Sequence, residues 1–152
     1  MELKNLIQQY LEQTKMMQLA TSANDQPWIC NVWFAADADL NIYWFSGKSR
    51  RHCAEVIENP RVAGAVVFPQ TPEDVPRGVQ FQGTTTRLTN EADIQAAISL
   101  YAGRIFPEAK IQQLMQPTAP NPHDFYRITP ELFVLFDAVN FPTSSRQEYR
   151  PN

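Results

Sequence analysis

The chain has 152 residues and a net charge of −3, with 43% hydrophobic residues and 13 Lys and Arg against 16 Asp and Glu. A chain of this length and apolar content can bury one sizeable core, so we expect residues 1–152 to form a single domain. The acidic balance argues against a nucleic-acid-binding protein, and no apolar run approaches the roughly 18 residues that a membrane span needs.

Neither cysteine belongs to a recognisable metal or redox motif. Cys30 and Cys53 are far apart in the sequence, and on a helix His52 and Cys53 would point about 100° away from each other. We therefore expect no metal site and two free thiols in a reducing cytoplasm, with a single disulfide as the alternative. The first residues contain no apolar segment before a small-residue cleavage site, which favours the same cytoplasmic location.

Residues 1–15 are expected to contain an amphipathic helix, because apolar residues recur there at helical spacing. These residues are Leu3, Leu6, Ile7, Tyr10 and Leu11. Three strands are predicted next, at 16–21, 28–35 and 40–45, separated by polar turn sequences. Such short intervals indicate an antiparallel meander.

The remainder of the chain mixes helices with strands. We expect helices at 50–58, at 90–103 and from Pro107, and strands at 61–68, 78–88 and 126–139. The polar tail 140–152 either is mobile or reaches across to a partner. Together these patterns predict a mainly β fold, a six-stranded antiparallel barrel with flanking helices.

The predicted helix at 50–58 begins with positive charge. Ser49 is a suitable N-cap and Asn59-Pro60 ends the helix, but Arg50 and Arg51 lie where the helix dipole is already positive. This placement costs only about a few tenths of a kcal/mol per charge, and a bound anion would reverse its sign. The charge pattern therefore favours an anion site at this helix start.

The groups around this helix start suit a phosphate in particular. Lys48 and His52 extend the basic cluster, and Ser46 and Ser49 add hydroxyls beside the free N–H groups of the first turn. A local basic cluster in an acidic chain points to a small anionic ligand. The alternative interpretation is a basic turn that is merely solvated.

Other patterns that carry chemistry are weak. Gly47-Lys48-Ser49 resembles the end of a nucleotide-binding P-loop, but the glycine required five positions earlier is Ile42. No Gly-x-Ser-x-Gly occurs, and neither cysteine has a nearby base, so nothing indicates a protein nucleophile. A phosphate site without a protein acid, base or nucleophile points to a cofactor that supplies its own chemistry.

Several segments together resemble a known family, the pyridoxamine 5′-phosphate oxidase-like FMN-binding split barrels. They are the aromatic strand end Tyr43–Ser46, the turn Ser49–His52, the strand entry Asn59–Val62, the strand Arg77–Gly83 and the strand entry Tyr126–Pro130. The resemblance covers about Met16 to Asp137. No single motif is diagnostic, but the order and spacing of the segments are fairly specific.

The resemblance implies a six-stranded split barrel that binds FMN at the interface of a homodimer. It assigns the phosphate to a turn that comprises Lys48, Ser49, Arg50, Arg51 and His52, with His52 at the family's usual lysine position. It assigns the strand end beside the ribityl phosphate to Phe45 and Ser46. The strand whose backbone lies along the isoalloxazine ring is matched by Cys30, Asn31, Val32 and Trp33. The later strand near the flavin, supplied partly by the second subunit, is matched by Gly78 and Gln80.

The chain also departs from the pyridoxine phosphate oxidases proper. Those enzymes carry an arginine at the position of Cys30, a flavin-contacting glutamine at that of Gly78, and a C-terminal Arg-x-His, whereas the tail here reads Arg146-Gln147-Glu148. Vitamin B6 oxidation is therefore not expected. We expect an FMN-dependent oxidoreductase acting on an unknown small molecule, or alternatively a non-catalytic flavin, haem or F420 binding or sensing protein.

Overall fold

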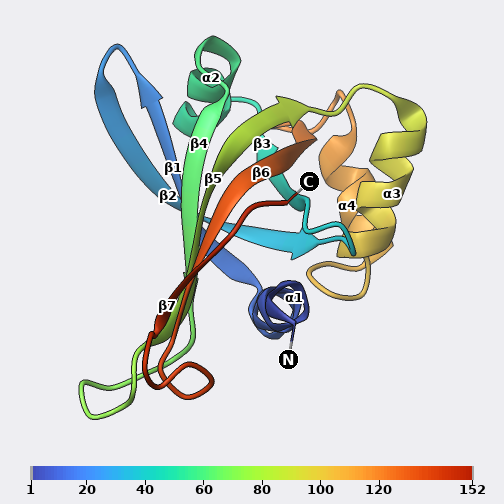
Figure 1. Ribbon diagram of the computed structural model, residues 1–152. Helices are drawn as coiled ribbons and strands as arrows, with labels where there is room; N and C mark the ends of the chain where they lie inside the picture. Colours follow the sequence, from blue (N-terminus) through green and yellow to red (C-terminus); the bar gives the residue numbers. More distant parts are fainter. Residues whose placement is uncertain (1, 152) are drawn as a thin grey trace.

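The computed structural model describes residues 2–151, which form one curled antiparallel sheet of seven strands with four helices (Figure 1). The elements are α1 Leu3–Gln13, β1 Met16–Ala23, β2 Gln26–Ala36, β3 Ile42–Gly47, α2 Arg51–Glu58, β4 Arg61–Val67, β5 Arg77–Arg87, α3 Glu91–Tyr101, α4 Glu108–Met115, β6 His123–Asp137 and β7 Arg146–Tyr149. The strand order is β3-β2-β1-β4-β5-β6-β7, and β3 also pairs with β6. This additional pairing closes the sheet, which confirms the predicted mainly β split barrel with flanking helices.

Alternation along β3 divides the core into two parts. Trp44 belongs to a cluster inside the barrel, where its ring stacks on Tyr126 at a centroid distance of 4.0 Å. The next residue, Phe45, faces the other way and packs with Tyr101 and Phe125 in a second cluster beneath α3 and α4. Side chains on a strand alternate between its faces, so β3 is buried on both sides and connects the two clusters.

The β1–β2 hairpin turns over two residues, as the polar sequence there predicted. Asn24 and Asp25 have φ values of 52° and 59°, and Ala23 pairs with Gln26 on either side of them. Two consecutive positive φ values define a type I′ turn, which asparagine and aspartate tolerate better than other residues with side chains. The hairpin arm projects beside α2 in Figure 1.

The polar tail contributes a strand that the sequence did not predict. Within 140–152, β7 pairs with Phe133–Phe136 of β6, which makes seven strands where six were expected. Only Gln147 and Tyr149 are half-buried, and Tyr149 packs against the barrel core. An alternation carried by two residues is too short to be recognised from sequence.

The start of α2 differs from the prediction. Arg50, not Ser49, is the N-cap, and its side chain makes no capping hydrogen bond. The Ser49 amide instead donates to Asn121 Oδ1 at 3.1 Å, and the Lys48 amide donates to the Pro122 carbonyl at 3.0 Å. These bonds tie the turn to the proline-rich connector before β6, and the helix begins one residue later than predicted.

Two polar contacts hold α1 against the rest of the fold. Arg104 Nη2 donates to the backbone carbonyls of Leu11, Glu12 and Thr14, at 3.2, 3.1 and 2.6 Å. These are carbonyls at the helix end, which have no partner inside the helix.

No helix within residues 2–151 is long and apolar enough to cross a membrane.

The second contact is a buried carboxylate. Asp137, fully inaccessible at the end of β6, accepts hydrogen bonds from the Tyr10 hydroxyl, the Val139 and Asn140 amides and the Asn140 side chain. Burial alone would raise the pKa of Asp137, but these donors outweigh it and lower the pKa. Burial beside this carboxylate raises the pKa of Tyr10 to about 12, so the phenol remains a donor.

Candidate functional site

A cavity of about 500 Å³ lies where β2, the end of β3, the start of α2 and the start of β6 meet. Its walls are formed by Trp28, Cys30, Asn31, Val32, Trp33, Phe45, Ser46, Gly47, Arg50, Arg51, His52 and His123. Pockets of roughly 300–1,000 Å³ are typical of small-molecule and cofactor sites. Segments distant in sequence therefore bring aromatic, hydroxyl and cationic groups to one concave surface.

The structure brings most of the residues proposed from sequence to this one cavity. They are Cys30, Asn31, Val32 and Trp33 from β2, Phe45 and Ser46 from β3, and Arg50, Arg51 and His52 from the start of α2. The β2 segment is held from behind by α3, because the Tyr101 hydroxyl donates to the Trp33 carbonyl at 2.5 Å. The ring of Tyr101 also packs edge-on against Phe45.

Four proposed residues do not line the cavity. Lys48 Nζ lies 3.8 Å from Asp124 Oδ2, and the Ser49 amide is bound to Asn121. Gly78 is buried on β5 beside β4, and Gln80 faces the outer surface of the sheet. Asp124 at the start of β6 and Asn121 in the preceding connector thus hold Lys48 and Ser49 away from the cavity.

Three lining residues were not proposed from sequence: Trp28, Gly47 and His123. His123 lies opposite Gly47 across the β3–β6 pairing, and its ring is 4.9 Å from that of Phe45. Its Nδ1 lies 2.8 Å from the carbonyl oxygen of Asn121, an acceptor, so the imidazole donates there and leaves Nε2 without a protein partner among residues 2–151. No sequence signal places His123 near His52, because only the β3–β6 pairing brings them together.

Arg51 is oriented by two neighbours at the cavity mouth. Its guanidinium carbon lies 4.0 Å from the centroid of the Trp28 ring, and its Nε donates to Glu55 Oε1 at 3.3 Å. The stacked ring and the carboxylate fix the plane of the guanidinium but leave its terminal nitrogens free for a ligand. Arg50 is exposed and has no acidic partner within residues 2–151.

The backbone adds donors to the same corner. Among residues 2–151, no acceptor binds the amides of Arg51 and His52, whereas the Cys53 and Ala54 amides both donate to the Arg50 carbonyl. Free amides at a helix start, together with the helix dipole, favour an anion. Two guanidiniums and two amides therefore present a donor set suited to a phosphate group, which fits the interpretation from sequence.

His52 is not a permanent cation. It is 8% exposed, its Nε2 lies 2.8 Å from Ser46 Oγ, and its ring is 5.6 Å from that of Trp44. Burial lowers the pKa of His52, Arg50 lowers it further, and Glu55 opposes them. The imidazole is therefore neutral at pH 7 when no anion is present.

The thiols are not activated nucleophiles. Burial raises the pKa of Cys30, which lines the cavity, to about 11, and it also raises the pKa of the buried Cys53 of α2. The thiolate is the reactive form, so both groups are inert at neutral pH. Both cysteines are free in the structure.

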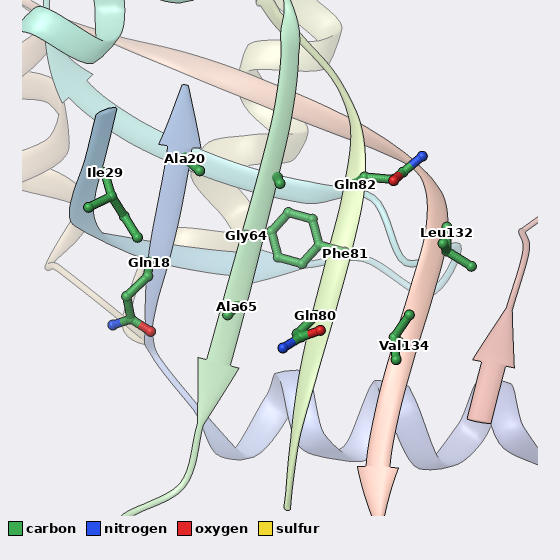
Figure 2. A pocket seen from close by; sticks show the side chains of 11 residues that line it. Gln18, Ala20, Ile29, Gly64, Ala65, Gln80, Phe81, Gln82, Leu132 and Val134 are labelled. Carbon is green, nitrogen blue, oxygen red and sulfur yellow. The ribbon is translucent and has the colours of Figure 1, made fainter. Parts of the chain in front are cut away.

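A second hollow, of about 350 Å³, lies on the outer face of the sheet (Figure 2). Its lining contains no charged residue: Gln18, Ala20, Ile29, Ala63, Gly64, Ala65, Gln80, Phe81, Gln82, Leu132 and Val134. The ring of Phe81 lies over Gly64, where any side chain would collide with it (Figure 2). Ile29 is 60% exposed at one side of this face.

The two hollows are adjacent. Gln18 lines the outer face, and its Nε2 donates at 3.0 Å to Oδ1 of Asn31, which lines the basic cavity. Gln18 and Asn31 are also paired in register across β1 and β2. A molecule seated on the outer face would therefore border the basic cavity.

Fold and cavity together define the class of protein, an antiparallel split barrel with an anion-suited helix start at its rim. Comparison with protein families places the chain within that class. The family model described as pyridoxamine 5′-phosphate oxidase matches residues 3–135, and the chain belongs to this family. This membership was predicted from the sequence.

The names of the curated relatives state no activity. A UPF0306 protein of Yersinia pseudotuberculosis serotype O:3 is 29% identical over 107 residues, 70% of this chain and 71% of its own length. A UPF0306 protein of Photorhabdus laumondii is 29% identical over 89 residues, which span 58% of this chain and 62% of the relative. The match thus covers less than two thirds of the Photorhabdus protein.

Solved structures share the fold at low identity. General Stress Protein 26 from Bacillus anthracis has a TM-score of 0.70 and 15% identity, with 99% of each chain covered. A heme binding protein from Mycobacterium smegmatis has a TM-score of 0.77 and 13% identity, with 99% of this chain and 59% of that chain covered. A FAD-binding protein from Mesorhizobium loti has a TM-score of 0.63 and 20% identity, with 85% and 88% covered. The fold therefore occurs in proteins named for flavin and for haem.

Proposed function

We propose that the protein is an FMN-binding oxidoreductase acting on a small molecule. The observation that carries the proposal is the basic cavity, where Arg50, Arg51 and two free amides meet in a chain of the pyridoxamine 5′-phosphate oxidase family. FMN joins a dianionic phosphate to a planar ring, and the walls of the cavity offer both cationic donors and aromatic residues.

Each wall would then hold one part of the cofactor. Arg50, Arg51 and the α2 amides would bind the phosphate, and Ser46 would donate or accept beside the ribityl chain. The β2 segment from Cys30 to Trp33 would lie along the ring, in the position fixed by Tyr101. When bound, the flavin supplies hydride chemistry, while the protein binds, orients and excludes water.

We also propose a homodimer with the flavin at the interface. The outer face of the sheet is uncharged, exposes Ile29, and borders the cavity through the Gln18–Asn31 hydrogen bond. A second copy on this face would bring its own Gln80, and the neighbouring Gly78 strand, toward the site, which accounts for their distance from the cavity within one chain. Native mass spectrometry of freshly purified protein tests both the dimer and the retained ligand.

Vitamin B6 oxidation is not part of the proposal. Cys30 stands where those oxidases carry an arginine, and the strand β7 has no histidine that could grip a phosphorylated substrate. The substrate, electron donor and acceptor are therefore to be found by screening. A cytoplasmic location stays the expectation from the two free thiols.

A second candidate is a binding or sensing protein without turnover, and His123 gives a reason to test haem. Its Nε2 is unpartnered in the cavity wall, and imidazole is a common axial ligand of haem iron. One structural neighbour is named as a heme binding protein. The deazaflavin F420, which also joins a planar ring to phosphate, is tested alongside.

The deciding experiment titrates ligand-free protein with FMN, riboflavin, F420 and haemin, followed by NADH and NADPH turnover assays. FMN should bind more tightly than riboflavin, because riboflavin lacks the phosphate. Multiple turnovers of bound flavin support an enzyme, whereas tight FMN binding without turnover over a broad donor panel supports a carrier. Tighter binding of haemin or F420 than of FMN would replace the cofactor assignment.

A further inference from the structure

The cavity combines permanent and titratable positive groups. Arg50 and Arg51 are charged at every accessible pH, whereas His52, the next residue of α2, is a buried imidazole in the same wall. The Nδ1 of His52 has no hydrogen-bond partner among residues 2–151, although the side chain is more than nine-tenths buried. An unpartnered polar atom in a cavity wall is a group available to a ligand.

The hydrogen bond between His52 and Ser46 tolerates both protonation states. A serine hydroxyl both donates and accepts, so Ser46 Oγ can donate to a neutral Nε2 or accept from a protonated one across the same 2.8 Å. Protonation therefore leaves no buried orphan on the Ser46 side. In the protonated ring both nitrogens carry a hydrogen, so Nδ1 is a donor whichever tautomer the neutral ring adopts.

In the ligand-free protein, the groups around His52 determine whether its imidazole is charged. Burial and Arg50 favour the neutral ring, and Glu55, which is shared with Arg51, opposes them. The other titratable groups at this corner are His123, Asp124 and Tyr126 from β6, Cys30 from β2, Cys53 of α2 and Lys48 of the turn, which lies against Asp124. Within residues 2–151, no carboxylate lines the cavity itself.

We propose that His52 takes up a proton when a phosphate group enters the cavity, so that anion binding at this site is coupled to protonation of a buried imidazole. The inference rests on the proposed function, because it requires a phosphate at the start of α2. A dianion beside His52 favours the imidazolium and reverses the balance set by burial and Arg50. The charge that completes the site is thus supplied by solvent at the moment of binding.

The affinity for a phosphate ligand should therefore depend on pH. His52 binds fewer protons in the free protein than in the complex, so affinity rises as pH falls from 8 toward 6.5, by at most about tenfold per pH unit for one proton. Near pH 6 the phosphate itself begins to protonate, which opposes further tightening. The contribution of His52 in this range is therefore the difference between the unaltered protein and the His52→Gln variant, because both bind the same phosphate.

The test is calorimetric titration of the full chain with FMN at pH 7, in buffers of different ionisation enthalpy. The slope of observed enthalpy against ionisation enthalpy counts the protons taken up. We expect net uptake with FMN, none with riboflavin, and none with FMN in the His52→Gln variant. The matched control is His123→Gln, which removes the other imidazole of the same cavity and should keep the uptake.

A second variant, His52→Lys, supplies a permanent charge. It should bind FMN without proton uptake and with an affinity that is nearly constant from pH 6.5 to 8. FMN binding without proton uptake by the unaltered protein, or equal uptake by His52→Gln, overturns the inference and leaves the proposed function standing. Failure of FMN to bind at any pH refutes the proposed function itself, and the proton-linked site with it.

Discussion

The basic cavity and the α1 anchor use the same kinds of polar group to opposite effect. At the anchor, Asp137 is surrounded by donors and Arg104 Nη2 donates to three carbonyls, although the buried Nε of Arg104 has no partner within residues 2–151. At the cavity, counting partners within residues 2–151, Arg50 has no acidic partner, Arg51 retains free nitrogens, and the amides of Arg51 and His52 lack acceptors. Saturated polar groups hold a fold together, whereas unsaturated ones at a concave surface are available for binding.

The largest expected effect comes from removing the Asp137 carboxylate at the α1 anchor. Asp137→Ala leaves the Tyr10 hydroxyl and the Val139 and Asn140 amides without their acceptor, and should lower the free energy of unfolding by about 3 kcal/mol. Urea unfolding measures the loss. FMN affinity of the folded fraction should change little, and an equal loss of both would contradict the division between the two regions.

The same carboxylate predicts acid sensitivity. The pKa of Asp137 is lower in the folded protein than in the unfolded chain, so its stabilisation is present above the unfolded value of about 4 and is lost as pH falls through the folded value. Asp137→Asn should flatten this acid limb of the stability curve. An acid limb that is the same in both proteins would show that other carboxylates carry it.

The next effect concerns the end of α1. Arg104→Ala removes the donor to the Leu11, Glu12 and Thr14 carbonyls and should cost about 2 kcal/mol of stability. Amide hydrogen exchange should show faster opening of α1 than of the barrel strands. Arg104→Lys, which retains the charge and fewer donors, should fall between the two proteins.

The fourth prediction tests the basic cavity, where polar groups lack partners. Arg51→Ala should weaken FMN binding by about 1–2 kcal/mol, the usual worth of a charged hydrogen bond. It also leaves the buried Glu55 carboxylate without its Arg51 partner, so thermal stability is measured alongside. Lys48→Ala is the matched control, because this neighbouring cation lies against Asp124 outside the cavity. Equal losses in the two variants would indicate a diffuse electrostatic effect in place of direct contact.

The smallest expected effect tests whether the Trp28 ring orients the Arg51 guanidinium. Trp28→Ala leaves Arg51 in place but removes the ring 4.0 Å from its guanidinium, and should weaken FMN binding by about 0.5–1 kcal/mol. Trp28→Phe should recover part of the loss. Full affinity in Trp28→Ala would show that Glu55 alone orients Arg51.

Local signals predicted most of the fold. The spacing of Leu6, Ile7 and Leu11 located α1, and Asn24-Asp25 located the hairpin turn. The start of α2 was placed one residue early, because its register is set by Asn121, which only the tertiary structure brings near. Strand β7 was missed because β6, and not its own sequence, makes it a strand.

The cavity was predictable in the parts that are contiguous in sequence. Arg50, Arg51 and His52 follow one another, and the β2 segment is a single run, so motif and resemblance located both. His123 comes from the opposite wall and Trp28 from near the turn of the β1–β2 hairpin, and neither carries a motif. The structure places Lys48 beside Asp124 and not in the cavity wall, a contact that charge in the sequence alone does not reveal.

Trp44 gives this chain a built-in optical signal. Its indole is fully buried, donates to Thr85, and lies 5.6 Å from the imidazole of His52, whereas Trp28 and Trp33 are exposed and emit at longer wavelength. A positively charged imidazole quenches a neighbouring indole far more than a neutral one does. The blue edge of the tryptophan fluorescence can therefore report the charge of His52 in unlabelled protein.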